Sequence, residues 1–173
     1  SFETYAGGSF SNGYRTVNNG SVSLAGWAVG GTSVDIVNGA FGAFSGNGID
    51  MLGTPGPGSL SQSFASTVGQ TYLLSFDLSR NGSSDPYINV SFAGGAVTQY
   101  VGGTSLVPAH YTLSYTASNA STLLTFSSVG NGNSGAVLDN VSVTAVPEPE
   151  TYAMLLAGLG LIGMVRRRKN KAA

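Results

Sequence analysis

The sequence contains no cysteine and little charge, and both absences narrow the possible functions. Without cysteine, the 173-residue chain can form neither a disulfide, nor a thiolate metal site, nor a cysteine nucleophile. Charged residues make up 9% of the chain, whereas about 25% is usual for soluble proteins. Stability must therefore come from an apolar core or a bound ion, and the surface must be largely neutral.

Positive charge is scarce in most of the chain and concentrated at its end. Residues 1–146 contain two basic residues against six acidic ones, a net charge of −4, whereas residues 166–173 carry five positive charges. A domain with only two basic residues cannot bind the successive phosphates of a nucleic acid. The sequence therefore predicts no nucleic-acid partner, and the basic end must have another role.

Residues 1–146 show alternating apolar and polar residues, separated by glycine, asparagine and serine. The clearest case is "TYLLSFDLS", whose alternate apolar residues fall on one face of an extended chain. "YINVSF", "HYTLSYT" and "AVLDNVSV" follow the same pattern. In the last of these, four residues are predicted to share a face: Val137, Asp139, Val141 and Val143.

Weaker alternation in five further segments brings the predicted total to eight or nine strands: "TSVDIV", "GIDML", "LSQSF", "AVTQYV" and "TLLTFSSV". Turn sequences such as "RNGSSDP" and "VGNGNSG" separate the strands, and no helical spacing of apolar residues is sustained before Pro147. One all-β domain over residues 1–146 is therefore predicted. An antiparallel two-sheet sandwich is the simplest way to bury so many half-apolar strands.

Three segments of this body resemble a known family. They are "GWAVGGTSVDIV", "GNGIDMLGTPGPGSLSQSFASTVGQTYLLSFDLS" and the closing "GAVLDNVSV". Together with the initial "SFE", they resemble secreted bacterial choice-of-anchor C domains and related galactose-binding-like domains. The resemblance implies a jelly-roll sandwich, a fold widely used for carbohydrate-binding modules.

The same resemblance implies a structural calcium ion held by Glu3 near the start and Asp139 in the last strand. Carboxylate and carbonyl oxygens are the ligands that calcium prefers. The alternative is that Glu3 is a frayed terminal residue and Asp139 makes turn hydrogen bonds. Calcium is accordingly a predicted cofactor with a structural role.

Candidates for catalysis are few. The single histidine, His110, is predicted to be an exposed or capping residue, because no nucleophile motif lies near it. Asp77, Arg80 and Asp85 surround the "RNGSSDP" turn, where a local ion pair explains them better than a pair of hydrolase carboxylates. The sequence therefore predicts that the protein is not an enzyme.

Trp27 is the candidate for sugar stacking, because an aromatic face packs well on a pyranose ring. Its apolar neighbours favour the alternative that Trp27 fills the core. Three tyrosines are further candidates for stacking: Tyr14, Tyr87 and Tyr100.

After residue 146 the chain changes character. Pro147 and Pro149 cannot donate to a β-ladder, so residues 147–151 are predicted to be an exposed linker. Residues 152–165 carry no charge and would span about 21 Å as one apolar α-helix. That is short for a bilayer core of about 30 Å, but Tyr152 can lie at one interface and the arginines at the other. The basic tail, residues 166–173, would stay cytoplasmic.

The order "VPEPET", apolar helix and "RRRKNK" closely resembles the PEP-CTERM sorting signal. In that signal Pro147, Glu148 and Pro149 form the motif read by an exosortase-type membrane enzyme. A basic stop-transfer block follows the helix: Arg166, Arg167, Arg168 and Lys169. The resemblance implies a Gram-negative exported protein with an amino-terminal signal peptide that is removed, and transit through the inner membrane to the cell surface or matrix. Such proteins are associated with exopolysaccharide, flocs and biofilm.

The predicted function is a non-enzymatic cell-surface or matrix protein that binds polysaccharide or acts as a scaffold. The alternative is a self-assembling extracellular filament whose C-terminal helices pack into a core. Four small residues of the helix would permit such close packing: Ala153, Ala157, Gly160 and Gly163. A homo-oligomer or filament is therefore a second possible assembly.

Overall fold

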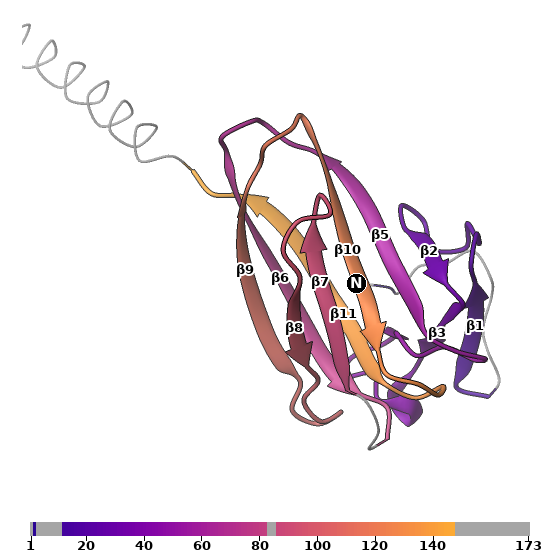
Figure 1. The fold of residues 1–173 in the computed structure, drawn as a ribbon. Helices are drawn as coiled ribbons and strands as arrows, with labels where there is room; N and C mark the ends of the chain where they lie inside the picture. The colour runs from indigo at the N-terminus through magenta and orange to yellow at the C-terminus, as the bar shows by residue number, and fades with distance from the viewer. Residues whose placement is uncertain (1, 3–11, 83–85, 148–173) are drawn as a thin grey trace, which may run out of the picture.

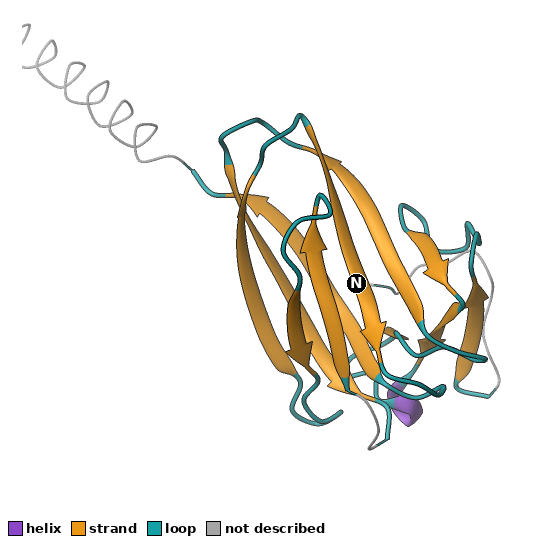
Figure 2. Ribbon diagram, in the orientation of Figure 1, coloured by secondary structure: helices purple, strands orange, loops and turns teal. Residues whose placement is uncertain are grey.

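The computed structural model describes residue 2, residues 12–82 and residues 86–147 (Figure 1). These residues form two antiparallel β-sheets that pack face to face (Figure 2). Within the described chain, one sheet has six strands in the spatial order β1 (Tyr14–Asn18), β3 (Ser33–Val37), β4 (Gly48–Asp50), β11 (Ala136–Ala145), β6 (Thr71–Arg80) and β9 (Ala109–Thr116). The other has five, in the order β2 (Ala28–Gly31), β5 (Gly58–Ala65), β10 (Ser121–Val129), β7 (Tyr87–Phe92) and β8 (Thr98–Val101). The predicted all-β antiparallel sandwich is confirmed.

The predicted number of strands was too low. All nine predicted segments are strands, and the described residues contain two more, β1 and β2. Both are short edge strands whose sequences, "YRTVN" and "AVGG", contain few apolar residues. Their pairing with β3 and β5 holds them in the sheets, so no local alternation was needed to form them.

The core lies between the two sheets. In β6, the alternate residues Leu74, Phe76 and Leu78 are fully buried, as their alternation predicted. The Phe76 ring lies at the centre, with centroid distances of 5.1 Å to Tyr100 and 5.4 Å to Phe126. Burial of these apolar side chains is the main stabilising contribution to a domain without disulfides.

The last strand differs from its prediction, because β11 contains a bulge. The register with β6 shifts between Asp139 and Ser142, and Asn140 has a positive φ of 51°. One extra residue reverses the alternation of the strand. Val141 therefore packs against the main core, whereas Val137 belongs to a separate cluster on the other face. Val137 and Asp139, which both precede the bulge, share the outer face as predicted, but the prediction that Val141 and Val143 lie on that face was wrong.

The outer face of the six-stranded sheet is partly covered by loops. In β3, Val34 and Ile36 point into the main core, so Asp35 and Val37 point outward. A single turn of 3-10 helix, η1 (Gly39–Phe41), follows β3 (Figure 2). The Asn38 side chain accepts a hydrogen bond from the Ala40 N–H in this turn. This covered region is where the candidate site lies.

No helix of the described chain is long and apolar enough to cross a membrane. The apolar helix predicted over residues 152–165 lies outside the described residues.

Candidate functional site

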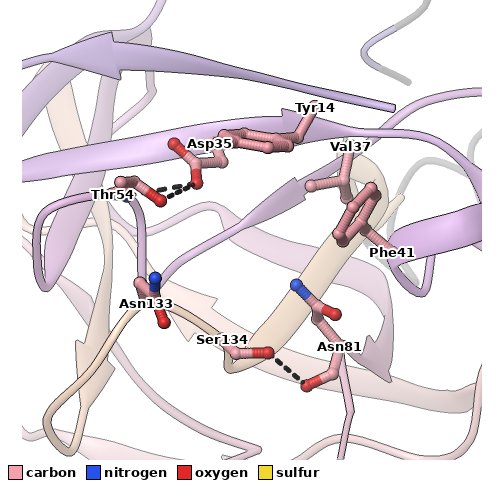
Figure 3. Close-up of a pocket in the computed structure, with 8 residues that line it drawn as sticks. All are labelled: Tyr14, Asp35, Val37, Phe41, Thr54, Asn81, Asn133 and Ser134. Atoms are coloured by element: carbon pink, nitrogen blue, oxygen red, sulfur yellow. Dashed lines mark hydrogen bonds between the residues drawn. The ribbon is translucent and has the colours of Figure 1, made fainter. Parts of the chain in front are cut away.

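A cavity of about 200 Å³ opens on the outer face of the six-stranded sheet, beside β1 and β3. Its walls come from two strands, η1 and three loops (Figure 3). The lining residues are Tyr14, Asp35, Val37, Phe41, Thr54, Asn81, Asn133 and Ser134. The cavity therefore combines two aromatic rings with one carboxylate and several neutral polar groups.

Tyr14 and Phe41 form the aromatic part of the wall. Their ring centroids are 5.4 Å apart and the planes meet at 68°, an edge-to-face arrangement. Gly13 makes this packing possible, because its φ is +81° and a Cβ there would lie 2.7 Å from the Phe41 ring. The apolar wall thus depends on a glycine in a conformation that other residues rarely adopt.

Asp35 is a buried carboxylate in the wall, with 3% of its surface exposed. Its Oδ2 accepts hydrogen bonds from the Thr54 N–H (3.1 Å) and hydroxyl (2.9 Å), and Figure 3 shows both. Its Oδ1 is buried and has no hydrogen-bond partner in the described chain. A carboxylate in this state is costly to bury.

Asp50 lies directly opposite Asp35 in the pairing of β3 with β4 and is 1% exposed. Its Oδ1 accepts from the Leu52 N–H (3.0 Å) and the Gly135 N–H (3.1 Å). Its Oδ2 accepts from the Asn81 amide at 2.8 Å. Asp50 therefore connects three loops that surround the cavity.

The pKa of Asp50 is raised from 3.8 to about 7. Burial is the main cause, and the nearby charge of Asp35 raises this pKa further. The hydrogen bonds from Asn81, Leu52 and Gly135 favour the charged form but do not offset the burial.

The remaining wall is neutral and polar. The Ser134 hydroxyl donates to the Asn81 carbonyl at 2.8 Å, which joins the loop after β6 to the loop before β11 (Figure 3). Asn133 adds a second amide side chain. The lining residues include no Lys, Arg or His. An aromatic wall with amides, hydroxyls and one carboxylate suits a polyhydroxylated ring better than a phosphate or a purely apolar group.

A second polar group lies elsewhere on the same sheet. His110 of β9 is opposite Asp77 of β6, and their Nδ1 and Oδ1 atoms are 2.6 Å apart. The other Asp77 oxygen accepts from the Asn140 amide at 2.8 Å. The sequence instead placed Asp77 in a local cluster with Arg80, because the alternation could not show that β9 pairs with β6. Asp85, the third member of that cluster, lies outside the described residues.

Asp139, the predicted calcium ligand, is a buried carboxylate, 4% exposed. Its Oδ1 accepts from the Asn140 N–H at 2.7 Å, and Asp139 is paired in register with Asp77. A second carboxylate on the neighbouring strand suits a cation-binding position. No group of three or more acidic or histidine side chains among the described residues could hold a metal ion. Glu3 lies outside the described residues, so calcium stays a prediction.

Trp27, the residue predicted to stack on sugar or fill the core, is half-buried just before β2. Its ring centroid is 5.9 Å from that of Phe2 and 6.0 Å from that of Phe126. It also lines a second cavity of about 250 Å³ with Phe2, Gln62, Phe64, Leu124, Val141 and Val143. Of the three tyrosine alternatives, Tyr14 lines the first cavity, Tyr87 is exposed, and Tyr100 packs on Phe76.

Most of the predicted sorting signal lies outside the described residues. Pro147 is described and exposed. The other members are not described: Glu148, Pro149, Tyr152, Ala153, Ala157, Gly160, Gly163, Arg166, Arg167, Arg168 and Lys169.

Comparison with known structures gives partial matches at low sequence identity. The family 35 carbohydrate binding module from Clostridium thermocellum matches with a TM-score of 0.50 and 10% identity, over 76% of this chain and 99% of that one. The CBM22-1 xylan-binding domain from Paenibacillus barcinonensis Xyn10C matches with a TM-score of 0.48 and 15% identity, over 78% of this chain and 94% of that one. The first of these shows a shared jelly-roll fold.

Some matched structures are enzymes much longer than this chain. The GH115 4-O-methyl-alpha-glucuronidase BtGH115A matches at 15% identity with a TM-score of 0.46, over 61% of this chain. The chain spans 15% of that enzyme and 30% of an exo-beta-1,3-galactanase from Phanerochaete chrysosporium. No curated protein matches the chain in sequence.

Two families match in sequence. Residues 145–169 match the PEP-CTERM protein-sorting motif, as predicted from "VPEPET", and this motif indicates an exported protein at the cell surface or outside the cell. Residues 1–144 match the family described as Protein of unknown function (DUF642). The chain therefore belongs to the DUF642 family and carries a PEP-CTERM sorting motif after its β-sandwich.

Proposed function

We propose that this protein is a non-enzymatic polysaccharide-binding module of a bacterial cell surface or extracellular matrix, and that the cavity beside Tyr14 holds one sugar residue. The observation that carries the proposal is the composition of that cavity. Its volume of about 200 Å³ suits one ring rather than a long chain, so neighbouring sugars of a polymer would lie in solvent.

The cavity supplies the two kinds of contact that sugar rings require. The edge-to-face pair of Tyr14 and Phe41 provides an apolar wall for the C–H groups of a sugar. Asn81, Asn133 and Ser134 provide neutral donors and acceptors for hydroxyl groups. The fold shared with a carbohydrate binding module supports the proposal without identifying a ligand.

The cavity is better suited to binding than to hydrolysis. Glycoside hydrolysis generally uses two carboxyl groups that flank the scissile bond. Asp35 lines the cavity, whereas Asp50 is not among its lining residues and already accepts three close N–H hydrogen bonds. A single carboxylate in the lining supports recognition of a sugar rather than its cleavage.

The C-terminal motif supports export and sorting. In our proposal an exosortase-type enzyme recognises Glu148 between the two prolines while residues 152–165 lie in the inner membrane of a Gram-negative cell. The β-sandwich then reaches the surface or matrix, where exopolysaccharide of a biofilm or floc is its partner.

The test is binding of the full-length protein, kept in detergent, to a panel of soluble polysaccharides by calorimetry. Tyr14→Ala should weaken binding by about tenfold, because it removes an aromatic contact from the wall. Tyr87→Ala is the matched control, since Tyr87 is an exposed tyrosine of the other sheet. Binding that is insensitive to Tyr14→Ala would refute the site, and a correctly folded protein that binds no polysaccharide would refute the function.

A further inference from the structure

The described lining of the cavity contains a carboxylate and no basic side chain to balance it. Asp35 is nearly fully buried, yet among the described residues only Thr54 donates hydrogen bonds to it, and its Oδ1 has no partner there. No basic side chain lines the cavity. A ligand that enters the cavity therefore lies beside a carboxylate that no basic side chain of the lining pairs.

A second buried carboxyl group, that of Asp50, lies close to Asp35. It occupies the position directly opposite Asp35 on the neighbouring strand, where side chains on one face approach closely. The charge of Asp35 contributes to the raised pKa of Asp50, so the two carboxyl groups interact. Two carboxyl groups in a shared buried region favour a cation and disfavour a second anion.

We infer that the sugar residue bound in this cavity is an amino sugar, held through its protonated amine at Asp35; this inference rests on the proposed function. An ammonium group has three hydrogen-bond donors and no acceptor, which matches a carboxylate with spare acceptor capacity. An ammonium group also attracts the carboxylate through its positive charge, which a neutral hydroxyl cannot do. A uronic acid at the same position would be repelled.

The rest of the wall fits the same ligand. Tyr14 and Phe41 provide an apolar surface for the ring, while Asn133 and Ser134 are neutral partners for its hydroxyl groups. The amine accounts for the charge at Asp35, which a neutral sugar would leave unbalanced. The charged group of the ligand, rather than its ring, is thus the feature that Asp35 selects.

The test compares ligands that differ in one group. Oligomers of β-1,4-glucosamine and of N-acetylglucosamine, equal in length, are titrated into the full-length protein by calorimetry in a buffer that keeps the amine protonated. The free amine should bind about tenfold more tightly than the acetylated oligomer, because only the amine carries charge. Polygalacturonate should bind more weakly than either. Equal or tighter binding of the acetylated oligomer would overturn the inference.

Three variants test whether the effect comes from the cavity. Asp35→Asn keeps an oxygen acceptor for Thr54 and removes the charge, so the preference for the amine should disappear. Asp77→Asn removes one negative charge elsewhere on the same sheet and should leave the preference intact; loss of the preference in this control as well would indicate general attraction to an acidic protein and overturn the inference. Asn133→Asp adds a carboxylate to the wall and should strengthen the preference severalfold. If Asp35→Asn does not fold, an unchanged preference in Asn133→Asp overturns the inference.

The outcomes also separate this inference from the proposed function. Binding of neutral or acetylated sugars that depends on Tyr14, without any preference for the amine, overturns the amino-sugar assignment and leaves polysaccharide binding in place. Absence of binding to every polymer in the panel refutes both.

Discussion

The buried carboxyl of Asp50 should make the stability of the β-sandwich depend on pH. Its pKa in the folded protein is about 7, against an ordinary value of 3.8. Between these values the folded state binds more protons than the unfolded state, so the free energy of unfolding must fall as pH rises. The stabilising contribution is complete below pH 3.8 and is lost as pH passes through about 7.

The difference between these two pKa values corresponds to about 4 kcal/mol. This is a large share of the stability of an average domain, which is about 5–15 kcal/mol. It would lower a melting midpoint by about 10 °C in a domain of this size. The loss of stability should be centred in the weakly acid range, well above the pH at which exposed carboxyl groups titrate.

The assay is denaturant unfolding of wild type and Asp50→Asn at about pH 4.5 and about pH 8. Asparagine keeps an oxygen acceptor for the Leu52 and Gly135 N–H groups. Its amide meets the Asn81 amide, and that mismatch costs about 1–3 kcal/mol at every pH. Wild type should therefore lose stability relative to the variant as pH rises, although the variant is less stable at low pH.

A second variant tests the direction of the predicted change in stability with pH. Asn81→Ala removes the side-chain hydrogen bond that favours the charged form of Asp50. The pKa of Asp50 should rise further, and the loss of stability should extend to higher pH. Parallel pH profiles for wild type and Asp50→Asn would refute the reasoning, because they would show that Asp50 titrates equally in the folded and unfolded states.

Four further predictions concern calcium, the core, sorting and assembly. If Glu3 and Asp139 bind structural calcium, excess chelator should lower the melting midpoint by several degrees in wild type and have no effect in Asp139→Ala; equal midpoints in chelator and in calcium would exclude the ion. Phe76→Ala should cost about 3–5 kcal/mol in denaturant unfolding, whereas Leu73→Ala, at a more exposed position of the same strand, should cost far less; similar losses would contradict the assignment of the core. Glu148→Ala should abolish C-terminal processing in cells that contain the sorting enzyme, as judged by the mass of the surface protein, and unchanged processing would show that Glu148 is not recognised. Electron microscopy of the full-length chain without detergent should show no filaments, and ordered fibres would favour the alternative in which the C-terminal helices assemble.

The sequence by itself was sufficient to predict the fold class and the buried residues of the strands with the clearest alternation. In β6, β7 and β9 every second residue is apolar, and these residues pack inward in the structure. Alternation is a property of a single segment, so it can be recognised without knowing which strands are neighbours. The PEP-CTERM motif could also be recognised from the sequence, because it is a short linear segment.

The tertiary structure alone decided which residues share the candidate site. Asp35 and Asp50 lie in two weakly patterned strands, and only the pairing of β3 with β4 places them opposite each other. Tyr14 and Asn81 reach the same cavity from distant parts of the chain. Strand register and loop packing depend on interactions between segments far apart in sequence, which a local pattern does not record. For the same reason the bulge in β11, which separates Val137 from Val141, could be seen only once the strand was paired with β6.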